Sequence, residues 1–305
     1  MLSILENISP VFLVIALGYF SRKLGFLPDN FIQSANRLVY YVAIPILVFS
    51  EISRGNFAES FYLSQIAGTF IAAGVVLALS LVLGTLLKLS PDKKSTFCQI
   101  SYHGNLGYVG LAVVFYALGT GGRAEASVLA GFLILFQNII SISLFTLMPG
   151  RGNGLSTQNL YRFLGNPIIL STVLGLAFSA GGISLPSFVN STFHIVGDMA
   201  LPLALLIIGG SLTPLTVGRL KHVAFSTTLK LLVLPFTGYM LFRFLGVGTA
   251  QSLTAVILLA SPSATVSYVM AAEMGGDTDM AASAVTISTA ASIVTYTLWI
   301  AVVGF

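Results

Sequence analysis

Long apolar segments separated by short polar ones run through all 305 residues of the chain. A helix that crosses a membrane needs about 20 mainly apolar residues, because the hydrocarbon core is about 30 Å thick. Ten such segments can be delimited, and the pattern therefore predicts an all-α membrane protein with ten transmembrane helices. Their expected ranges are 5–26, 31–53, 61–88, 95–118, 123–148, 160–183, 187–212, 221–245, 251–274 and 281–304.

The longest polar gap between these segments runs from Pro149 to Asn159 and contains Arg151 and several glycines. It is the one credible linker in the chain. We therefore expect a first half over residues 1–149, a linker over 150–159 and a second half over 160–305, with five helices in each half.

The composition excludes an ordinary soluble domain. Hydrophobic residues make up 56% of the chain and charged residues 8%, whereas a soluble globular protein carries about 25% charged residues. The sequence contains no basic stripe of the kind that binds nucleic acid. Cys98 is the only cysteine, so disulfides within the chain and cysteine-based zinc sites are excluded. We expect no metal and no cofactor.

The basic residues predict how the chain is oriented, because cytoplasmic loops are enriched in Lys and Arg. The loops after the odd-numbered segments, with the adjoining helix ends, hold eleven of the 14 basic residues, and only Arg54, Arg123 and Arg243 lie on the other side. We expect a multi-pass protein of the plasma membrane, in bacteria the inner membrane, with both termini on the non-cytoplasmic side.

An internal repeat relates the two halves. A shift of 157 residues superposes five apolar segments on five, and it places Pro10 on Pro167 and Pro45 on Pro202. Because each half has an odd number of segments, the second half must be inverted in the membrane, as in many secondary carriers. The alternative is that hydrophobic segments of equal length align by default.

Two interruptions fall at matching positions in the fourth and ninth segments. Residues 103–110 of the fourth segment read HGNLGYVG, and residues 260–265 of the ninth read ASPSAT. Glycines and a proline weaken a continuous helix at these points, so we expect two broken helices that cross near the membrane centre. The N-termini of half-helices could there face an anion, whereas the alternative is close packing through small residues.

The predicted substrate site lies at this crossing. Asn105 is expected to be the most sensitive position, because its amide can donate to a carboxylate while neighbouring glycines let the backbone approach. Asn138 of the fifth segment, beside Gln137, is a further candidate whose alternative role is a hydrogen bond between helices. The expected substrate-binding residues are Gly104, Asn105, Gly107, Asn138, Ser261, Pro262, Ser263 and Thr265.

Ionisable residues inside predicted spans are candidates for coupling, because a charge in the membrane is costly. Asp198 and Lys230 are the most deeply placed opposite charges, and we expect them to interact directly or through substrate and water. The alternatives are that Asp198 forms a structural pair and that Lys230 snorkels to the interface. His103 at the first interruption is a third candidate, as a proton carrier or as a satisfied histidine that never titrates.

These segments resemble the auxin efflux carrier family of bacteria and plants, over essentially the whole chain. Residues 36–45, NRLVYYVAIP, resemble the family segment NRLVFYVALP, and residues 104–111, GNLGYVGL, resemble its GNTGFLGLP break. Asn166-Pro167 and residues 200–205, ALPLAL, also fit. One departure is Ala112, where the family usually has a proline, so the first break would rest on glycines alone.

The resemblance implies a fold with crossing broken helices four and nine, and export or exchange of small organic anions such as auxin-like indole acids or malonate-like carboxylates. The expected partners are that anion and the lipid bilayer, with homodimer formation left open. A sodium-coupled bile-acid-type symporter is the alternative, although its polar motifs are missing. A membrane enzyme would need clustered catalytic groups, and a sensor would prefer an appended signalling domain, so a carrier remains the expected function.

Overall fold

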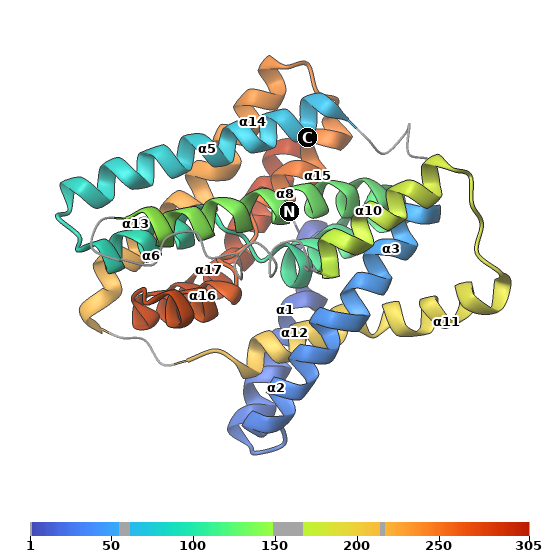
Figure 1. The fold of residues 1–305 in the computed structure, drawn as a ribbon, viewed down its shortest axis with the longest axis horizontal. Coiled ribbons are helices and arrows are strands. Elements are labelled where there is room, and N and C mark those ends of the chain that lie inside the picture. Colours follow the sequence, from blue (N-terminus) through green and yellow to red (C-terminus); the bar gives the residue numbers. More distant parts are fainter. Residues whose placement is uncertain (1, 55–61, 149–166, 214–216, 305) are drawn as a thin grey trace.

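The computed structural model describes residues 2–54, 62–148, 167–213 and 217–304, and this part of the chain is built of helices without named strands (Figure 1). The first half contains α1 (Leu2–Lys23), α2 (Asp29–Leu38), η1 (Val39–Ala43), α3 (Ile44–Arg54), α5 (Leu63–Leu86), α6 (Pro91–Tyr102), η2 (Leu106–Gly110), α7 (Leu111–Leu118), η3 (Gly119–Gly122) and α8 (Arg123–Leu147). The second contains α10 (Pro167–Ala180), α11 (Ser187–Asp198), α12 (Ala200–Gly210), η4 (Val217–Arg219), α13 (Leu220–Thr228), η5 (Leu229–Val233), α14 (Leu234–Phe244), α15 (Thr249–Leu259), α16 (Val266–Met274) and α17 (Thr278–Gly304).

Six helical segments of the described chain are long and apolar enough to cross a membrane. Three shorter apolar helices accompany them, Leu106–Leu118, Pro167–Ala180 and Thr249–Leu259. The observed bounds follow the predicted ones closely in places, since α5 spans Leu63–Leu86 where 61–88 was expected. The predicted linker 150–159 and the first residues of the sixth predicted span lie outside the described residues.

Prolines account for the irregular turns inside the long helices. A proline has no N–H, and its ring clashes with the carbonyl four residues earlier, so the helix must loosen just before it. The π-helical turn η1 precedes Pro45, and the π-helical turn η5 precedes Pro235. At Pro202 the same effect separates α11 from α12 at Met199. These turns divide single spans into two labelled pieces.

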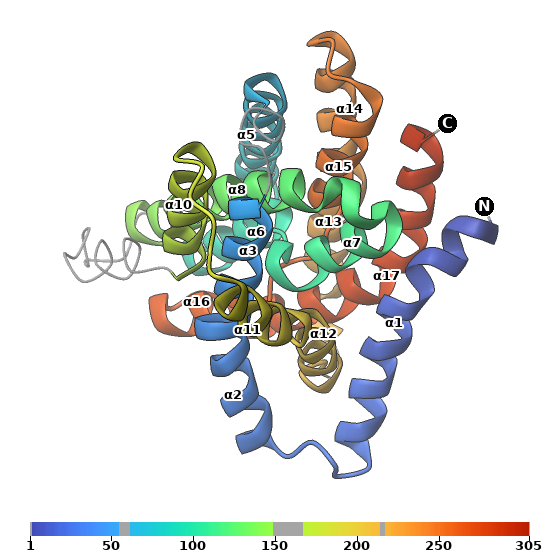
Figure 2. The same ribbon diagram turned by 90° about the vertical axis from the view of Figure 1, so that its right-hand side faces the viewer.

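Two helix pairs pack more closely than the rest, α1 with α12 and α10 with α3. Small residues allow the first approach: a Cβ at Gly18 would lie 2.2 Å from the carbonyl oxygen of Leu206, and a Cβ at Gly209 would lie 1.9 Å from that of Ile15. Figure 2 shows the start of α1 beside the end of α17, so the two ends of the described chain lie near each other.

Candidate functional site

The two predicted interruptions meet in space. Residues 103–105 separate α6 from η2, and residues 260–265 separate α15 from α16. Gly104 and Ser263 form an isolated antiparallel bridge between these segments. The two broken helices therefore contact each other at their interruptions.

Backbone hydrogen bonds hold the crossing together. The N–H of Asn105 donates to the carbonyl of Pro262 at 2.8 Å, and the N–H of Ala264 donates to the carbonyl of His103 at 3.0 Å. A break in a buried helix exposes polar backbone groups that must find partners, and here each break supplies partners for the other. The N–H groups of Asn105 and Ala264 are therefore already used, and side chains can add further contacts to an anion at this point.

Side chains from neighbouring helices complete the crossing. Gln137 of α8 accepts from the N–H of Gly104 at 3.3 Å and donates to the carbonyl of Tyr102 at 3.2 Å. The hydroxyl of Ser263 donates to the carbonyl of Ile100 at 2.9 Å, and its own N–H donates to the hydroxyl of Ser288 in α17 at 2.9 Å. These contacts fix the backbone of both breaks against α6, α8 and α17.

Two buried polar atoms at the crossing lack a hydrogen-bond partner. They are Nδ2 of Asn105, whose residue is 6% exposed, and Oγ of Ser261, which is fully buried. A buried donor without a partner costs about 1–3 kcal/mol, so such atoms mark places where a bound molecule can be recognised. The interruptions therefore leave unused hydrogen-bonding capacity beside their backbone contacts.

Lys230 brings a buried amine to the same place. Its side chain is fully buried, and its amine donates to the carbonyl of Leu259, the last residue of α15, at 2.6 Å. A positive charge is favourable at a helix C-terminus, where the carbonyl dipoles point. A Cβ at Gly104 would lie 3.1 Å from this amine and 2.2 Å from Oγ of Ser261, so the glycine keeps the space between them open.

Comparison with known proteins agrees with this arrangement. Residues 3–300 match the family described as "Membrane transport protein". The chain belongs to this family. Among its relatives, an uncharacterized transporter of Methanocaldococcus jannaschii is 24% identical over 300 residues, covering 95% of both chains. A Rhizobium meliloti protein named "Putative malonate transporter" is 26% identical over 305 residues, covering 94% of this chain and 92% of its own.

An uncharacterized transporter of Escherichia coli is 21% identical over 302 residues, covering 96% of both chains. Family membership and relatives named as transporters agree that this chain is a membrane transporter rather than an enzyme. The resemblance drawn from the sequence motifs is thereby confirmed at the level of a membrane transport protein family.

The expected direct pair of Asp198 with Lys230 is not formed in this membrane transport protein. The carboxylate of Asp198 is bonded to Nδ1 of His194, one turn earlier in α11, at 2.8 Å, and its side chain is 62% exposed. Lys230 does not snorkel, because it is buried against Leu259. Asp198 ends α11 just before the break at Met199. Its depth along the span could not reveal the side of the helix on which it lies.

The remaining candidates divide between the crossing and its surroundings. His103 is buried at the crossing, with Nδ1 3.0 Å from the hydroxyl of Ser141. Gly107 is buried against Ile44 of α3 rather than against α15 or α16. Thr265 is half-buried at the start of α16.

Asn138 is half-buried, and it is the neighbouring Gln137 that bonds to the crossing. Consecutive residues of a helix point about 100° apart, so only one of this pair can face a given site. Sequence reasoning also missed Ser288, since nothing separates it in the sequence from the many other hydroxyls of α17.

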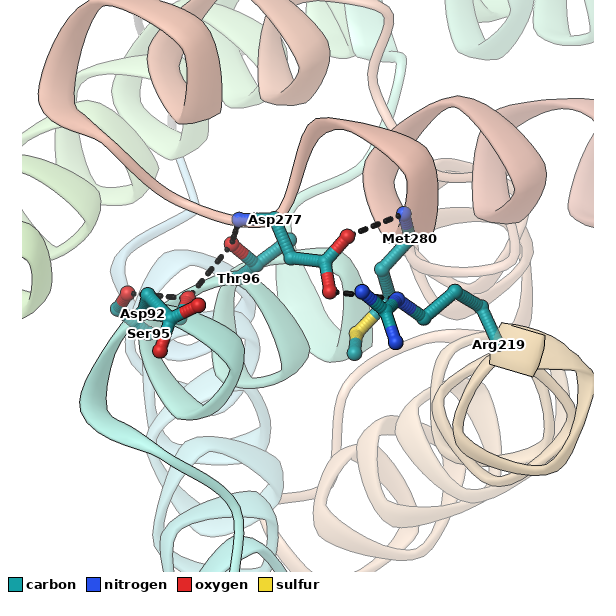
Figure 3. Close-up of polar contacts among 6 residues, drawn as sticks. All are labelled: Asp92, Ser95, Thr96, Arg219, Asp277 and Met280. Atoms are coloured by element: carbon teal, nitrogen blue, oxygen red, sulfur yellow. Dashed lines mark hydrogen bonds and ion pairs between the residues drawn. The ribbon is translucent and has the colours of Figure 1, made fainter. Parts of the chain in front are cut away.

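A second polar cluster, separate from the crossing, ties together three segments that are far apart in the sequence. Figure 3 shows Asp277, in the turn between α16 and α17, between Arg219 of η4 and Thr96 of α6. Arg219 Nε lies 2.7 Å from the Asp277 carboxylate, which also accepts from the N–H of Met280 at 3.0 Å. The Asp277 N–H donates to Thr96 Oγ1 at 2.9 Å. This cluster, which we call the Asp277 cluster, joins the first broken helix to the end of the second.

Proposed function

We propose that the chain is a secondary carrier that moves small carboxylate-bearing anions across the membrane by alternating access, as an efflux carrier or exchanger. The proposal rests on three buried groups of the crossing segments and their neighbour η5. They are the unpartnered Asn105 amide, the unpartnered Ser261 hydroxyl and the amine of Lys230. The substrate carboxylate would bind at the crossing of the two broken helices.

The chemistry of these three groups suits a carboxylate. An amide N–H and a hydroxyl donate to its oxygens, and an ammonium compensates its charge, which strengthens the hydrogen bonds. The amine of Lys230 can donate three hydrogen bonds, and one of them goes to Leu259. A buried cation that keeps donors available favours an anionic substrate over a neutral or cationic one.

Reciprocal packing supports the two-half design that alternating access requires. A Cβ at Gly18 would touch the carbonyl oxygen of Leu206, and a Cβ at Gly175 would lie 3.3 Å from that of Phe49. Gly175 is the 157-residue equivalent of Gly18, and Leu206 is that of Phe49. The glycine surface of each half thus packs against the same surface of the other half. Such reciprocal contacts are typical of two units related by a two-fold axis. We propose that this axis lies in the membrane plane and relates residues 1–149 to 160–305.

The name of one relative supports the class of substrate. The Rhizobium meliloti protein carries the name of a malonate transporter and aligns with almost the whole chain. Malonate offers two carboxylates on a three-carbon frame, so we take it as the first substrate to test, with other mono- and dicarboxylates beside it.

The test of the site is an asparagine-to-alanine pair measured in proteoliposomes. Asn105→Ala removes the unpartnered amide and should lower malonate uptake at least about tenfold, the effect of losing one hydrogen bond to a charged group. Asn138→Ala makes the same chemical change on α8, away from the contacts of the crossing, and should transport normally. Both variants should elute as folded protein. Normal uptake by Asn105→Ala would refute the assignment.

A further inference from the structure

A pair of adjoining cavities opens at the end of α8 far from the Asp277 cluster. Their volumes are about 220 Å³ and 250 Å³, and they share Leu47, Arg123, Gly197 and Asp198 as lining residues. Arg123 is the first residue of α8, whereas Gln137, which touches the crossing, lies 14 positions further along. At 1.5 Å per residue the two places are about 21 Å apart. We call this pair of cavities the Arg123 cavity.

The guanidinium of Arg123 has hydrogen-bonding capacity that the protein leaves unused. Its central carbon lies over the Phe115 ring, 4.9 Å from the ring centroid. Its nearest carboxylate oxygen, on Glu51, is 3.8 Å from NH1, beyond hydrogen-bond reach, and Nε is buried without a partner. Stacking through its face leaves the donor edge of a guanidinium free, and that edge matches a carboxylate in shape.

A second unpartnered group lines the same space. Ser50 is 5% exposed, lines the cavity, and its hydroxyl has no hydrogen-bond partner. The other charged groups here are Arg54, whose Nε donates to Asn190 at 2.9 Å, and the His194–Asp198 pair. Asp198 is therefore already engaged by His194, and Glu51 is the carboxylate that faces Arg123.

We propose that the Arg123 cavity is a second anion site, which binds a small carboxylate through Arg123 and Ser50 before or after it occupies the crossing. Glu51 acts there as an internal competitor, which holds the place of the anion when the site is empty and repels it when it arrives. The choice of a carboxylate rests on the proposed function, while the site itself rests on the unpartnered groups. A carrier gains from such a site because it concentrates the anion at the mouth of the pathway.

Substitution of Arg123 and substitution of Glu51 should change the affinity for the anion in opposite directions. Arg123→Gln removes the donor edge and should weaken anion binding at least about tenfold. Glu51→Gln removes the competitor and the repulsion, and should tighten binding severalfold. If the pair merely ties α8 to α3, both substitutions break the same contact and should change binding in the same direction.

A tryptophan introduced into the Arg123 cavity can report anion binding at that cavity. Tyr116 lines the cavity beside Arg123 and is exposed, so Tyr116→Trp places an indole there, with the native Trp299 as a constant background. Titration of the purified full-length protein with malonate should give a saturable change, and titration with uncharged malonamide should give none. The Arg123→Gln and Glu51→Gln variants are then titrated in this reporter protein.

Adding Asn105→Ala to the reporter protein separates the two sites. The fluorescence change of the introduced indole should persist with unaltered affinity, although transport is lost. If Asn105→Ala abolishes the signal, the reporter senses only the crossing, and the second site is refuted while the proposed function stands. No saturable change with malonate, or equal effects of Arg123→Gln and Glu51→Gln, would also overturn it. Saturable binding in a protein that transports no carboxylate would refute the proposed function alone.

Discussion

Gly104 holds the narrowest place of the crossing. A Cβ at this position would lie 2.2 Å from Oγ of Ser261 and 3.1 Å from the Lys230 amine. Both neighbours are fully buried, so a side chain at this position would have to displace one of them. A glycine here therefore lets the Ser261 hydroxyl and the Lys230 amine approach the same point.

Gly104→Ala should abolish malonate uptake, at least about tenfold below the parent protein, because a displaced Ser261 or Lys230 no longer faces the substrate. The matched control is Gly74→Ala in α5, where a Cβ would meet nothing within 4 Å. The control should transport normally and should be no less stable, since alanine favours a helix over glycine. Uptake by Gly104→Ala at the control rate would show that the crossing is not the site.

Among single residues, the sequence located Asn105 and Ser261 because a glycine-rich and a proline-containing interruption share one repeat offset. It could not choose between Gln137 and Asn138, since both amides lie in the same turn of an apolar helix. It also could not find that Asp198 turns away from Lys230, because the depth of a residue along a span says nothing about the face on which it lies. Direction around a helix is set by tertiary packing.

At the level of elements, Pro235 shows how an irregular turn is stabilised from another helix. The proline cannot donate to the carbonyl of Leu231, four residues earlier, and the indole N–H of Trp299 in α17 donates to that carbonyl at 2.8 Å. Leu231 is 1% exposed, so its carbonyl is buried, and the indole supplies a donor where Pro235 has none. The π-helical turn η5, which precedes α14, is therefore stabilised by a residue 68 positions away.

Trp299→Phe should lower the melting temperature, because the lost hydrogen bond leaves a buried acceptor that costs about 1–3 kcal/mol. Pro235→Ala restores an N–H that can donate to the same carbonyl within the helix. The penalty of Trp299→Phe should therefore be smaller when Pro235→Ala is present, which a double-mutant cycle measures as coupling. Strictly additive melting-temperature shifts would mean that the indole does not compensate the proline.

The elements themselves were largely predictable. Runs of apolar residues predicted the position of α5 within two residues at each end, and the interruptions at 103–105 and 260–265 appeared where glycine and proline interrupt the pattern. The π-helical turns η1 and η5 were not predicted, although Pro45 and Pro235 were the available signal. A proline in the sequence predicts that a helix will be irregular at that point. Whether the helix kinks, forms a π-helical turn or ends there depends on which neighbour supplies a hydrogen bond.

At the scale of the whole molecule, the Arg123 cavity and the Asp277 cluster lie at opposite ends of α8. Arg123 begins the helix, and Phe145 near its other end is 2.7 Å from a Cβ built at Gly276, next to Asp277. The two residues are 22 positions apart in α8, which corresponds to about 33 Å, comparable to the hydrocarbon core of a membrane. The ion pair is close at the Asp277 end and loose at the Arg123 end, 2.7 Å against 3.8 Å. The acidic and basic groups are thus paired more tightly at one end of α8 than at the other.

Thr96→Val tests whether the Asp277 cluster stabilises the protein. Valine has the shape of threonine but leaves the Asp277 N–H, which is buried, without its acceptor. We expect a lower melting temperature, corresponding to about 1–3 kcal/mol. The control is Thr192→Val on the exposed part of α11, where the hydroxyl bonds only to its own helix, and it should have little effect. Equal stability of the two variants would show that the Asp277 cluster does not hold α6 to the end of α16.

Counterflow in proteoliposomes tests the central claim of a carboxylate carrier most directly. Vesicles containing the purified protein are loaded with excess unlabelled malonate and diluted into a trace of labelled malonate. A carrier with one alternately exposed site should accumulate label transiently above equilibrium, because returning sites are occupied by unlabelled substrate inside. The account predicts this overshoot for the parent protein, inhibition of it by other carboxylates that share the site, and no overshoot for Asn105→Ala. Label entry no faster than in protein-free vesicles, or an overshoot that survives Asn105→Ala, would contradict it.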